Sequence, residues 1–239
     1  MSVLLLTLAG PLQAWGSRSR FTERHTELAP TKSGVIGMLA AARGLARTAD
    51  LGALATLRFG VRIDQPGEII RDFQTARSRD GKESMPLSQR YYLGDAVFLV
   101  GVESQGRAEL ERVQRELRAP AFPLFLGRRS CPPSGPIRTE LRDGTIEEAF
   151  ADAVWEASRR HRLQRRNSAR VELETLIDAS AGESGTFRVR DIPVSFAPEQ
   201  RLHSWREVRA GVVAIPNPDV APTPYPDEHD AFAAFTEGA

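Results

Sequence analysis

Short apolar runs alternate with stretches of helical spacing along the N-terminal half of the chain. Residues 3–9 form an apolar run that ends at a Gly-Pro pair, which predicts a buried strand. Apolar residues then recur at helical spacing over residues 34–46, and Thr31 or Ser33 can cap the helix that this spacing predicts. The pattern therefore begins with a strand followed by a helix.

The same two patterns continue up to residue 126. Residues 59–63 alternate as in a strand with one buried face, and residues 96–100 form a second apolar run. An apolar stripe at helical spacing runs through residues 107–118, and residues 122–126 predict a short last strand. The order strand, helix, strand, strand, helix, strand is that of an α+β, ferredoxin-like (RRM-like) core.

A long insertion, residues 65–94, separates the second and third predicted strands, where a short loop would be enough. β-Forming and aromatic residues occupy 69–75 and 89–93, and the polar stretch 77–82 lies between them. This pattern predicts a long β-hairpin that protrudes from the core.

The C-terminal part has a different character. A Gly/Pro-rich joint follows residue 126, and helical spacing then covers residues 146–157. Three further segments have strand-like patterns: 171–177, 186–194 and 211–215. We expect three parts: a ferredoxin-like core with its protruding hairpin over 1–134, a small β-rich unit over 135–215, and a disordered, acidic, Pro-rich tail over 216–239.

Composition excludes several classes of protein. The chain has 239 residues, of which 41% are hydrophobic and 26% charged, as in soluble globular proteins. Its single cysteine, Cys131, excludes an internal disulfide and a cysteine-based zinc site. The apolar run at residues 3–9 has no basic residues before it and is too short to span a bilayer. We therefore expect a cytoplasmic protein with no membrane partner.

The distribution of charge is uneven. Residues 210–239 contain five acidic side chains and no Lys or Arg, which leaves residues 1–209 at a net charge of +6. Of the 32 basic residues, 30 are arginine. Because guanidinium groups suit bidentate contacts with phosphate, this favours a nucleic-acid partner. A compositional bias toward Arg, Ala and Gly would give the same count, so the alternative stays open.

Enzyme and cofactor motifs are weak. Thr31-Lys32-Ser33-Gly34 has the wrong order for a nucleotide-binding loop, although a helix N-terminus beside Lys32 suits one phosphate as well as a simple cap. None of the four histidines forms a metal-ligand pair at helical spacing, and the chain lacks a G-x-S-x-G motif. We expect no metal and no cofactor.

Basic and aromatic residues are interleaved in three segments: the stretch before the first helix, the hairpin and the joint. This combination suits stacking on bases and pairing with the phosphates of single strands. The candidate RNA-binding residues are Trp15, Arg18, Arg20, Arg24, Lys32, Ser33, Arg71, Arg77, Arg79, Lys82, Arg90, Tyr91, Gly127, Arg128 and Arg129.

Two details of these basic segments stay open at the level of sequence. Neighbours on an extended loop point to opposite sides, so either Arg128 or Arg129 should face RNA while the other pairs within the protein. The Arg-rich stretch 158–170 is either a phosphate contact or a solvated linker.

Several sequence blocks, in order along the chain, resemble one protein family. They are residues 6–16, 30–37, 71–75, 90–93, 126–132 and 204–208. They resemble the CasD family of subunits of type I-E CRISPR Cascade complexes. The resemblance implies a palm with a thumb hairpin, binding of the 5′ handle of the CRISPR RNA, and docking against the CasC filament subunit and the large CasA subunit. Contact with target DNA would come through the complex.

The resemblance also bears on catalysis. In such complexes a separate subunit, CasE, cuts the precursor RNA, so the resemblance implies a non-catalytic role for this chain. Relatives in another subtype cut RNA with Tyr, Lys and His, and Tyr91, Lys32 and His25 supply these residue types. The alternative is therefore a metal-independent endoribonuclease for repeat RNA that uses His25 or a tyrosine as a general acid–base.

Overall fold

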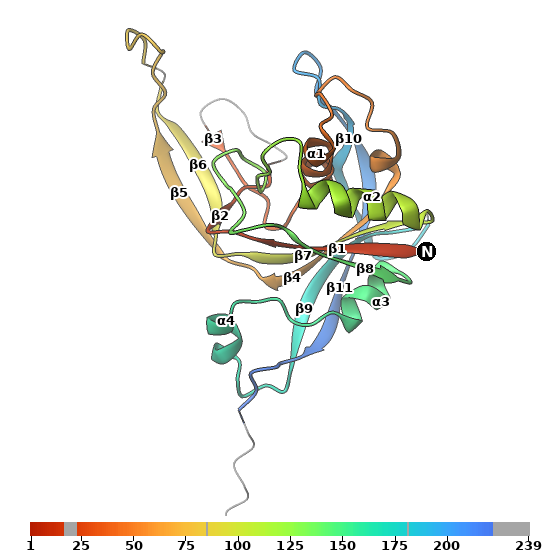
Figure 1. Ribbon diagram of the computed structural model, residues 1–239. Helices are drawn as coiled ribbons and strands as arrows, with labels where there is room; N and C mark the ends of the chain where they lie inside the picture. Colours follow the sequence, from red (N-terminus) through yellow and green to blue (C-terminus); the bar gives the residue numbers. More distant parts are fainter. Residues whose placement is uncertain (17–22, 85, 181, 222–239) are drawn as a thin grey trace, which may run out of the picture.

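The chain folds into a mixed α/β structure around a large antiparallel sheet (Figure 1). The structure, a computed structural model, describes residues 1–16, 23–84, 86–180 and 182–221. Within these residues, the sheet has seven strands in the order β10-β11-β9-β4-β7-β1-β8. The strands are β1 (Ser2–Ala9), β4 (Arg58–Gln65), β7 (Val97–Ser104), β8 (Arg138–Asp143), β9 (Arg170–Asp178), β10 (Thr186–Ser195) and β11 (Leu202–Pro216).

Helices cover both faces of the central strands. Side chains of β1 alternate between two clusters: Leu4, Leu6 and Leu8 pack in the core with α1 (Lys32–Arg43) and α2 (Arg107–Arg118). Val3 and Leu5 pack instead with α3 (Ile146–Asp152) on the opposite face. Because both faces of β1 are buried, its sequence is a continuous apolar run, as expected for such a strand.

The predicted last strand at residues 122–126 is wrong. This segment is irregular, and the strand that pairs with the free side of β1 is β8. Its sequence, Arg-Thr-Glu-Leu-Arg-Asp, contains one apolar residue because β8 lies at the edge of the sheet and is largely exposed. A polar edge strand of this kind gives no apolar run, so sequence patterning missed it.

The C-terminal strands belong to the same sheet as β1, β4 and β7. β9 pairs with β4 through Gly60–Arg62 and Thr175–Ile177, and β11 and β10 follow outward. Since β8 and β9 both lie beyond residue 134, the predicted division at that residue does not correspond to a break in the sheet. The helix expected over 146–157 ends at Asp152, and a short helix, α4 (Arg159–Gln164), follows it.

A second, smaller sheet is built on the insertion at 65–94. Its central strand β6 (Ser88–Gly94) pairs with β5 (Glu68–Gln74) on one side. On its other side it pairs with two short strands, β2 (Leu12–Gln13) and β3 (Glu23–Arg24). The β5–β6 ribbon extends away from the large sheet, toward the upper left of Figure 1.

The start of the predicted tail is structured, which corrects the boundary at residue 216. The Asn217 N–H donates to the Ala169 carbonyl at 2.9 Å, and its side-chain amide donates to the Arg165 carbonyl at 2.9 Å. Asp219 forms an ion pair with Arg162 at 2.7 Å. Residues 216–221 therefore pack against α4, and the rest of the predicted tail, 222–239, lies outside the described residues.

Candidate nucleic-acid interface

The small sheet presents two faces of different composition. Because β5 and β6 pair with Arg71 opposite Tyr91 and Asp72 opposite Arg90, side chains separate by period two. We call the face that carries Arg71, Phe73 and Tyr91 the Tyr91 face. The face that carries Asp72, Arg90 and Tyr92 is the Arg90 face.

Aromatic rings and a guanidinium group form the Tyr91 face. The ring of Tyr91 stacks on that of His25, with centroids 5.0 Å apart and planes at 14°. Beside it, the Arg71 guanidinium lies 4.8 Å from the centroid of Phe73, and both side chains are exposed. The face therefore offers flat, solvent-facing groups on which unpaired bases can stack.

The Arg90 face is basic. Arg24 on β3 pairs in register with Arg90 on β6, which places both side chains on this face. Arg24 is exposed, and the buried Nε of Arg90 has no hydrogen-bond partner among the described residues. The exposed Arg24 guanidinium is free to donate to a phosphate oxygen.

Arg128, in the Gly-rich loop at residues 126–132, forms hydrogen bonds that connect this loop to the small sheet. Its Nη1 donates to the Tyr91 carbonyl at 3.0 Å, and its Nη2 donates to the carbonyls of Arg24 at 2.6 Å and His25 at 3.0 Å. The same guanidinium lies 5.1 Å from the centroid of the buried Tyr92 ring. Arg128 is thus the member of the pair that bonds within the protein, and the neighbouring Arg129 is exposed.

The Gly127 position is required by protein packing. Its φ is +85°, and a Cβ there would lie 1.9 Å from the carbonyl oxygen of Ala14. The loop closes through hydrogen bonds between Leu126 and Cys131 at 2.7 Å and between Cys131 and Arg128 at 2.9 Å. Burial raises the pKa of the Cys131 thiol, which disfavours the thiolate. Packing of the loop thus requires glycine at position 127, and contact of Gly127 with phosphate stays a prediction.

Trp15 is a core residue, which corrects its place among the candidates. Its side chain is completely buried, and its indole N–H donates to Gln13 Oε1 at 3.0 Å. The ring also packs over the first turn of α1, since a Cβ on Gly34 would lie 2.8 Å from it. A ring enclosed in this way cannot stack on a base.

Lys32 and Ser33 lie at the N-terminus of α1, where protein groups take the place predicted for a phosphate. The Lys32 ammonium is buried and pairs with Asp178 at 2.8 Å, while the Lys32 backbone N–H donates to the Asp191 carboxylate at 2.8 Å. Thr31 caps the helix by accepting from the Gly34 N–H at 3.2 Å. A protein carboxylate therefore already occupies the N-terminus of α1, where half-buried Ser33 lies.

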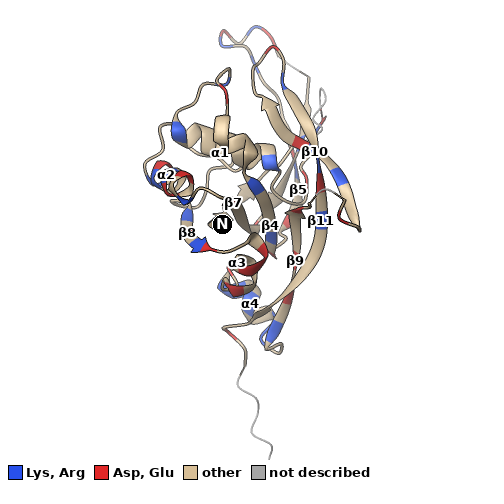
Figure 2. Cartoon of the chain, turned by 90° about the vertical axis from the view of Figure 1, so that its right-hand side faces the viewer, with Lys and Arg blue, Asp and Glu red and all other residues tan. Residues whose placement is uncertain are grey.

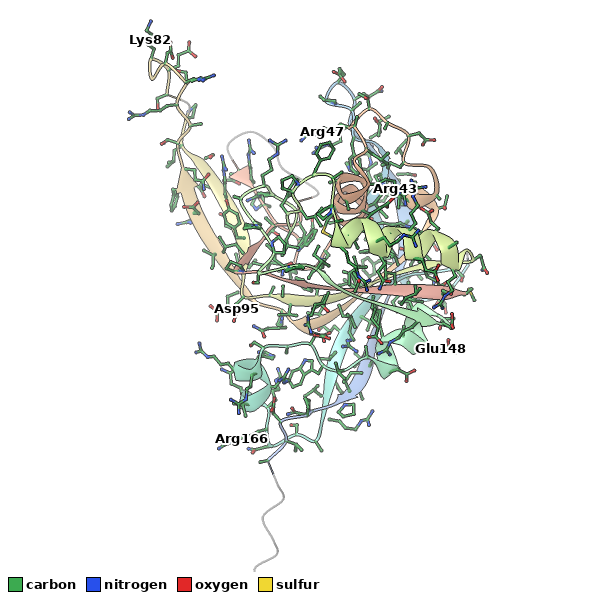
Figure 3. The ribbon with its side chains drawn as sticks, in the orientation of Figure 1. Arg43, Arg47, Lys82, Asp95, Glu148 and Arg166 are labelled. Atoms are coloured by element: carbon green, nitrogen blue, oxygen red, sulfur yellow. The ribbon has the colours of Figure 1, made fainter. Side chains whose placement is uncertain are left out.

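Three basic side chains lie at the tip of the hairpin. Arg77, Arg79 and Lys82 are exposed, and Figure 3 labels Lys82 at the far end of the ribbon. The turn between them is held by the Ser78 hydroxyl, which donates to Asp80 at 2.6 Å and accepts from the Glu83 N–H at 2.9 Å. The candidates Arg18 and Arg20 lie outside the described residues.

The residue types considered for RNA cleavage are not brought together. His25 and Tyr91 are in contact, but the Lys32 ammonium is held by Asp178 at the N-terminus of α1. Among the described residues, no group of three or more His, Cys, Asp or Glu side chains could hold a metal ion, and no helix is long and apolar enough to cross a membrane.

Two further residues lie on the Tyr91 face. Phe73 and His25 belong to the interleaved basic and aromatic segments but are not among the candidate RNA-binding residues, and the structure places them beside Arg71 and Tyr91. The signal was available in part, because aligning the two hairpin strands places Phe73, Arg71 and Tyr91 on one face by period two. The parallel pairing of β3 with β6, which brings in His25, has no comparable local signal.

Comparison with known proteins identifies the family. A model of the family described as CRISPR-associated protein (Cas_Cas5) matches residues 3–209. The chain is 34% identical over 155 residues to the CRISPR system Cascade subunit CasD of Escherichia coli (strain K12), covering 57% of this chain and 69% of that protein.

Two solved structures agree with this match. One, described as a CRISPR RNA-guided surveillance complex, covers 98% of both chains with a TM-score of 0.72 at 29% identity. Another, described as the crystal structure of a Cas protein, covers 93% of this chain and 99% of the other, with a TM-score of 0.66 at 36% identity. The chain therefore belongs to the CRISPR-associated Cas5 family.

Proposed function

We propose that this chain is a non-catalytic, RNA-binding subunit of a type I-E CRISPR RNA-guided surveillance complex, in which it holds the 5′ handle of the CRISPR RNA. Its family and its similarity to a chain of such a complex support membership. In this proposal β1, α1, β4, β7, α2 and β8 form a ferredoxin-like palm, supported by their order along the chain and by the strand order β4-β7-β1-β8. The β5–β6 ribbon is the thumb.

The observation that carries the RNA-binding role is the contrast between Arg128 and the arginines around it. Arg128 donates its hydrogen bonds to three backbone carbonyls and so fixes β3, β6 and the Gly-rich loop against one another. Arg24, Arg71 and Arg129 remain exposed around this rigid base. A fixed scaffold that carries free guanidinium groups beside aromatic rings is suited to a single RNA strand.

The mechanism needs no bond chemistry. Exposed arginines pair with phosphates, and the Tyr91 face takes unstacked bases. The tip residues Arg77, Arg79 and Lys82 extend the basic surface along the strand. Each phosphate that is neutralised releases counterions, so the affinity should fall steeply as the salt concentration rises.

The hairpin also has surface for protein neighbours. Four large apolar side chains on it are between 43% and 54% exposed: Ile69, Ile70, Phe73 and Leu87. Apolar surface of this kind marks contact sites. It supports docking against the CasC filament subunit and the large CasA subunit in a cytoplasmic ribonucleoprotein, with target DNA reached through the complex.

Deletion of the hairpin tip tests this proposal. Replacing residues 76–87 with a Gly-Ser turn removes the tip but keeps β5, β6 and the Arg128 bonds. We expect the melting temperature to change by only a few degrees, because these residues are outside the core. The affinity for a labelled 5′-handle RNA should fall at least about tenfold. An unchanged affinity would refute the proposed site.

The endoribonuclease alternative has its own test. Labelled repeat RNA is incubated with the purified protein in EDTA, with His25→Ala as the matched variant. The proposal predicts that the RNA stays intact. Cleavage at one site by the parent protein and not by the variant would replace the binding role with a catalytic one.

A further inference from the structure

A second basic surface lies far from the hairpin, around α4. Residues 159–166 contain five arginines, and the segment from Ala157 to Val171 contains no acidic residue. Figure 2 colours the basic residues of the chain blue, and Figure 3 labels Arg166 at the end of the molecule opposite Lys82. This surface is thus separate from the candidate interface on the small sheet.

One of the five arginines holds the segment in place. Arg162 pairs with Asp219 at 2.7 Å and donates to the Ala157 carbonyl at 2.9 Å. Ser158 caps α4 by accepting from the His161 N–H at 3.3 Å, and its own N–H donates to Gln65 at 3.0 Å. These bonds fix the backbone of the segment against the large sheet.

The other four arginines form what we call the α4 patch: Arg159, Arg160, Arg165 and Arg166. All four are exposed, and none has a side-chain partner in the part of the chain that the structure describes. Burial and the charge of Arg165 lower the pKa of the nearby His161, as expected in a positive local potential. The patch therefore combines a fixed backbone with uncompensated positive charge.

The surface is only slightly concave at this place. Arg159, Arg160, Leu163 and Gln164 line a shallow hollow of about 480 Å³ that is widely open to solvent. Leu163 is 39% exposed there, so its side chain offers a small apolar surface beside the guanidinium groups of Arg159 and Arg160. Such a lining suits a sugar-phosphate unit, with the guanidinium groups on phosphate and the apolar surface under the sugar or base.

We propose that the α4 patch binds the sugar-phosphate backbone of a second nucleic-acid segment, distinct from the strand held on the small sheet. The chemistry is that of a polyanion, since charge predominates and the only large apolar side chain in the hollow is Leu163. The segment can be single-stranded RNA or duplex DNA, because both present the same phosphates. The two sources are separated by experiment.

The test compares nucleic-acid binding by two charge-matched variants of the full chain. In the patch variant, Arg159, Arg160, Arg165 and Arg166 are replaced by Gln. In the control variant, four other exposed arginines without a side-chain partner among the described residues are replaced by Gln: Arg47, Arg115, Arg118 and Arg201. Fluorescence anisotropy is measured with a single-stranded RNA that lacks the handle and with a DNA duplex, each of about 20 nucleotides or base pairs, over a range of salt concentrations.

We expect the patch variant to lose at least about tenfold in affinity for one or both probes, with the slope of log K against log salt smaller by about 2 to 4. The control variant should change far less. Loss with the duplex alone assigns the patch to DNA, loss with the RNA alone assigns it to RNA, and loss with both assigns it to the shared backbone. If the patch variant binds both probes with the same affinity as the control variant, the inference is overturned. This holds even if the patch variant no longer assembles with acidic protein subunits.

Two half-variants guard against a folding defect in the patch variant. Arg159→Gln with Arg160→Gln, and Arg165→Gln with Arg166→Gln, should each reduce the salt slope by about half of the full effect. A third variant, with Arg71, Arg90 and Arg129 replaced by Gln, should lose handle RNA but retain the second probe. Failure of the patch and failure of the handle site are therefore distinguishable.

Discussion

The buried ionic cluster at the N-terminus of α1 and the Arg90 face, on which Arg24 is exposed, use the same kinds of side chain for opposite purposes. In the cluster, Arg206 pairs with Asp178 at 2.7 Å and with Asp191 at 2.5 Å, and Lys32 pairs with Asp178 at 2.8 Å. On the Arg90 face, Arg24 is exposed without such a partner among the described residues. The difference lies in the carboxylates that the fold supplies.

This contrast shows why a basic residue in a family motif is a poor guide to RNA contact. Lys32 and Arg206 come from two motifs far apart in the chain, and the fold joins them through acids on β9 and β10. Arg128 and Arg129 are adjacent, yet one is bonded to backbone carbonyls and the other is exposed. The partner of each cation depends on tertiary structure.

The largest expected effect is that of Arg206→Ala. The Asp191 side chain is 1% exposed, and removal of Arg206 leaves its carboxylate with the Lys32 backbone N–H. Asp178 would keep the Lys32 ammonium and the Phe59 N–H. Loss of one partner from a buried ion pair costs about 3–5 kcal/mol. Urea unfolding should show a fall of this size in the free energy of unfolding. A loss below about 1 kcal/mol would mean that the cluster is not important for stability.

The adjacent residues Arg128 and Arg129 allow a matched comparison in which the expected change in stability is smaller. Arg128→Ala removes three hydrogen bonds to backbone carbonyls and should lower the free energy of unfolding by about 1–3 kcal/mol. Arg129→Ala should leave stability unchanged and reduce the salt slope of handle-RNA binding by about one unit. Chemical denaturation and salt-dependent anisotropy on both variants test this. If Arg129→Ala unfolds the protein more easily and Arg128→Ala changes only the salt slope, the two roles are reversed.

Truncation at two positions separates the structured C-terminal residues from the predicted tail. A chain that ends at Ala221 keeps the bonds of Asn217 and Asp219 to the α4 segment, so we expect no loss of stability. A chain that ends at Ile215 lacks them and should lose about 1–2 kcal/mol. Equal melting temperatures for the two chains would show that residues 216–221 contribute nothing to the fold.

Much of the central architecture is visible in the sequence. The apolar run at β1, the alternation at β4 and the helical spacing of α1 and α2 predict these elements because burial imposes their periods. β8 was not predicted because a polar edge strand has no such period. The pairing that continues the sheet through β9, β11 and β10 was not predicted because strand pairing between distant segments leaves no local pattern.

The candidate site was predicted less completely than the fold. The pattern of residues 65–94 predicted a hairpin that carries Arg71, Arg90 and Tyr91, with the basic tip residues between its strands. That Arg24 joins this hairpin in a small sheet was not predicted, and contact of these residues with RNA stays a prediction. The sequence pattern could not show that Trp15 is enclosed or that Lys32 is paired, because both facts depend on residues distant in sequence. The sequence predicted that one of Arg128 and Arg129 bonds within the protein, and the structure shows that this residue is Arg128. Contact of Arg129 with RNA stays a prediction.

The most direct test of the central claim is the salt dependence of handle-RNA affinity for the parent chain and for a variant in which Arg24, Arg71, Arg90 and Arg129 are replaced by Gln. These side chains surround the rigid base that Arg128 forms, and none of them belongs to the buried cluster. We predict that the slope of log K against log salt becomes smaller by about 2 to 3 units, since about 0.7 counterions per phosphate are released from a single strand. The melting temperature should be unchanged. An unchanged slope in a stably folded variant would contradict the proposal that the small sheet holds the RNA.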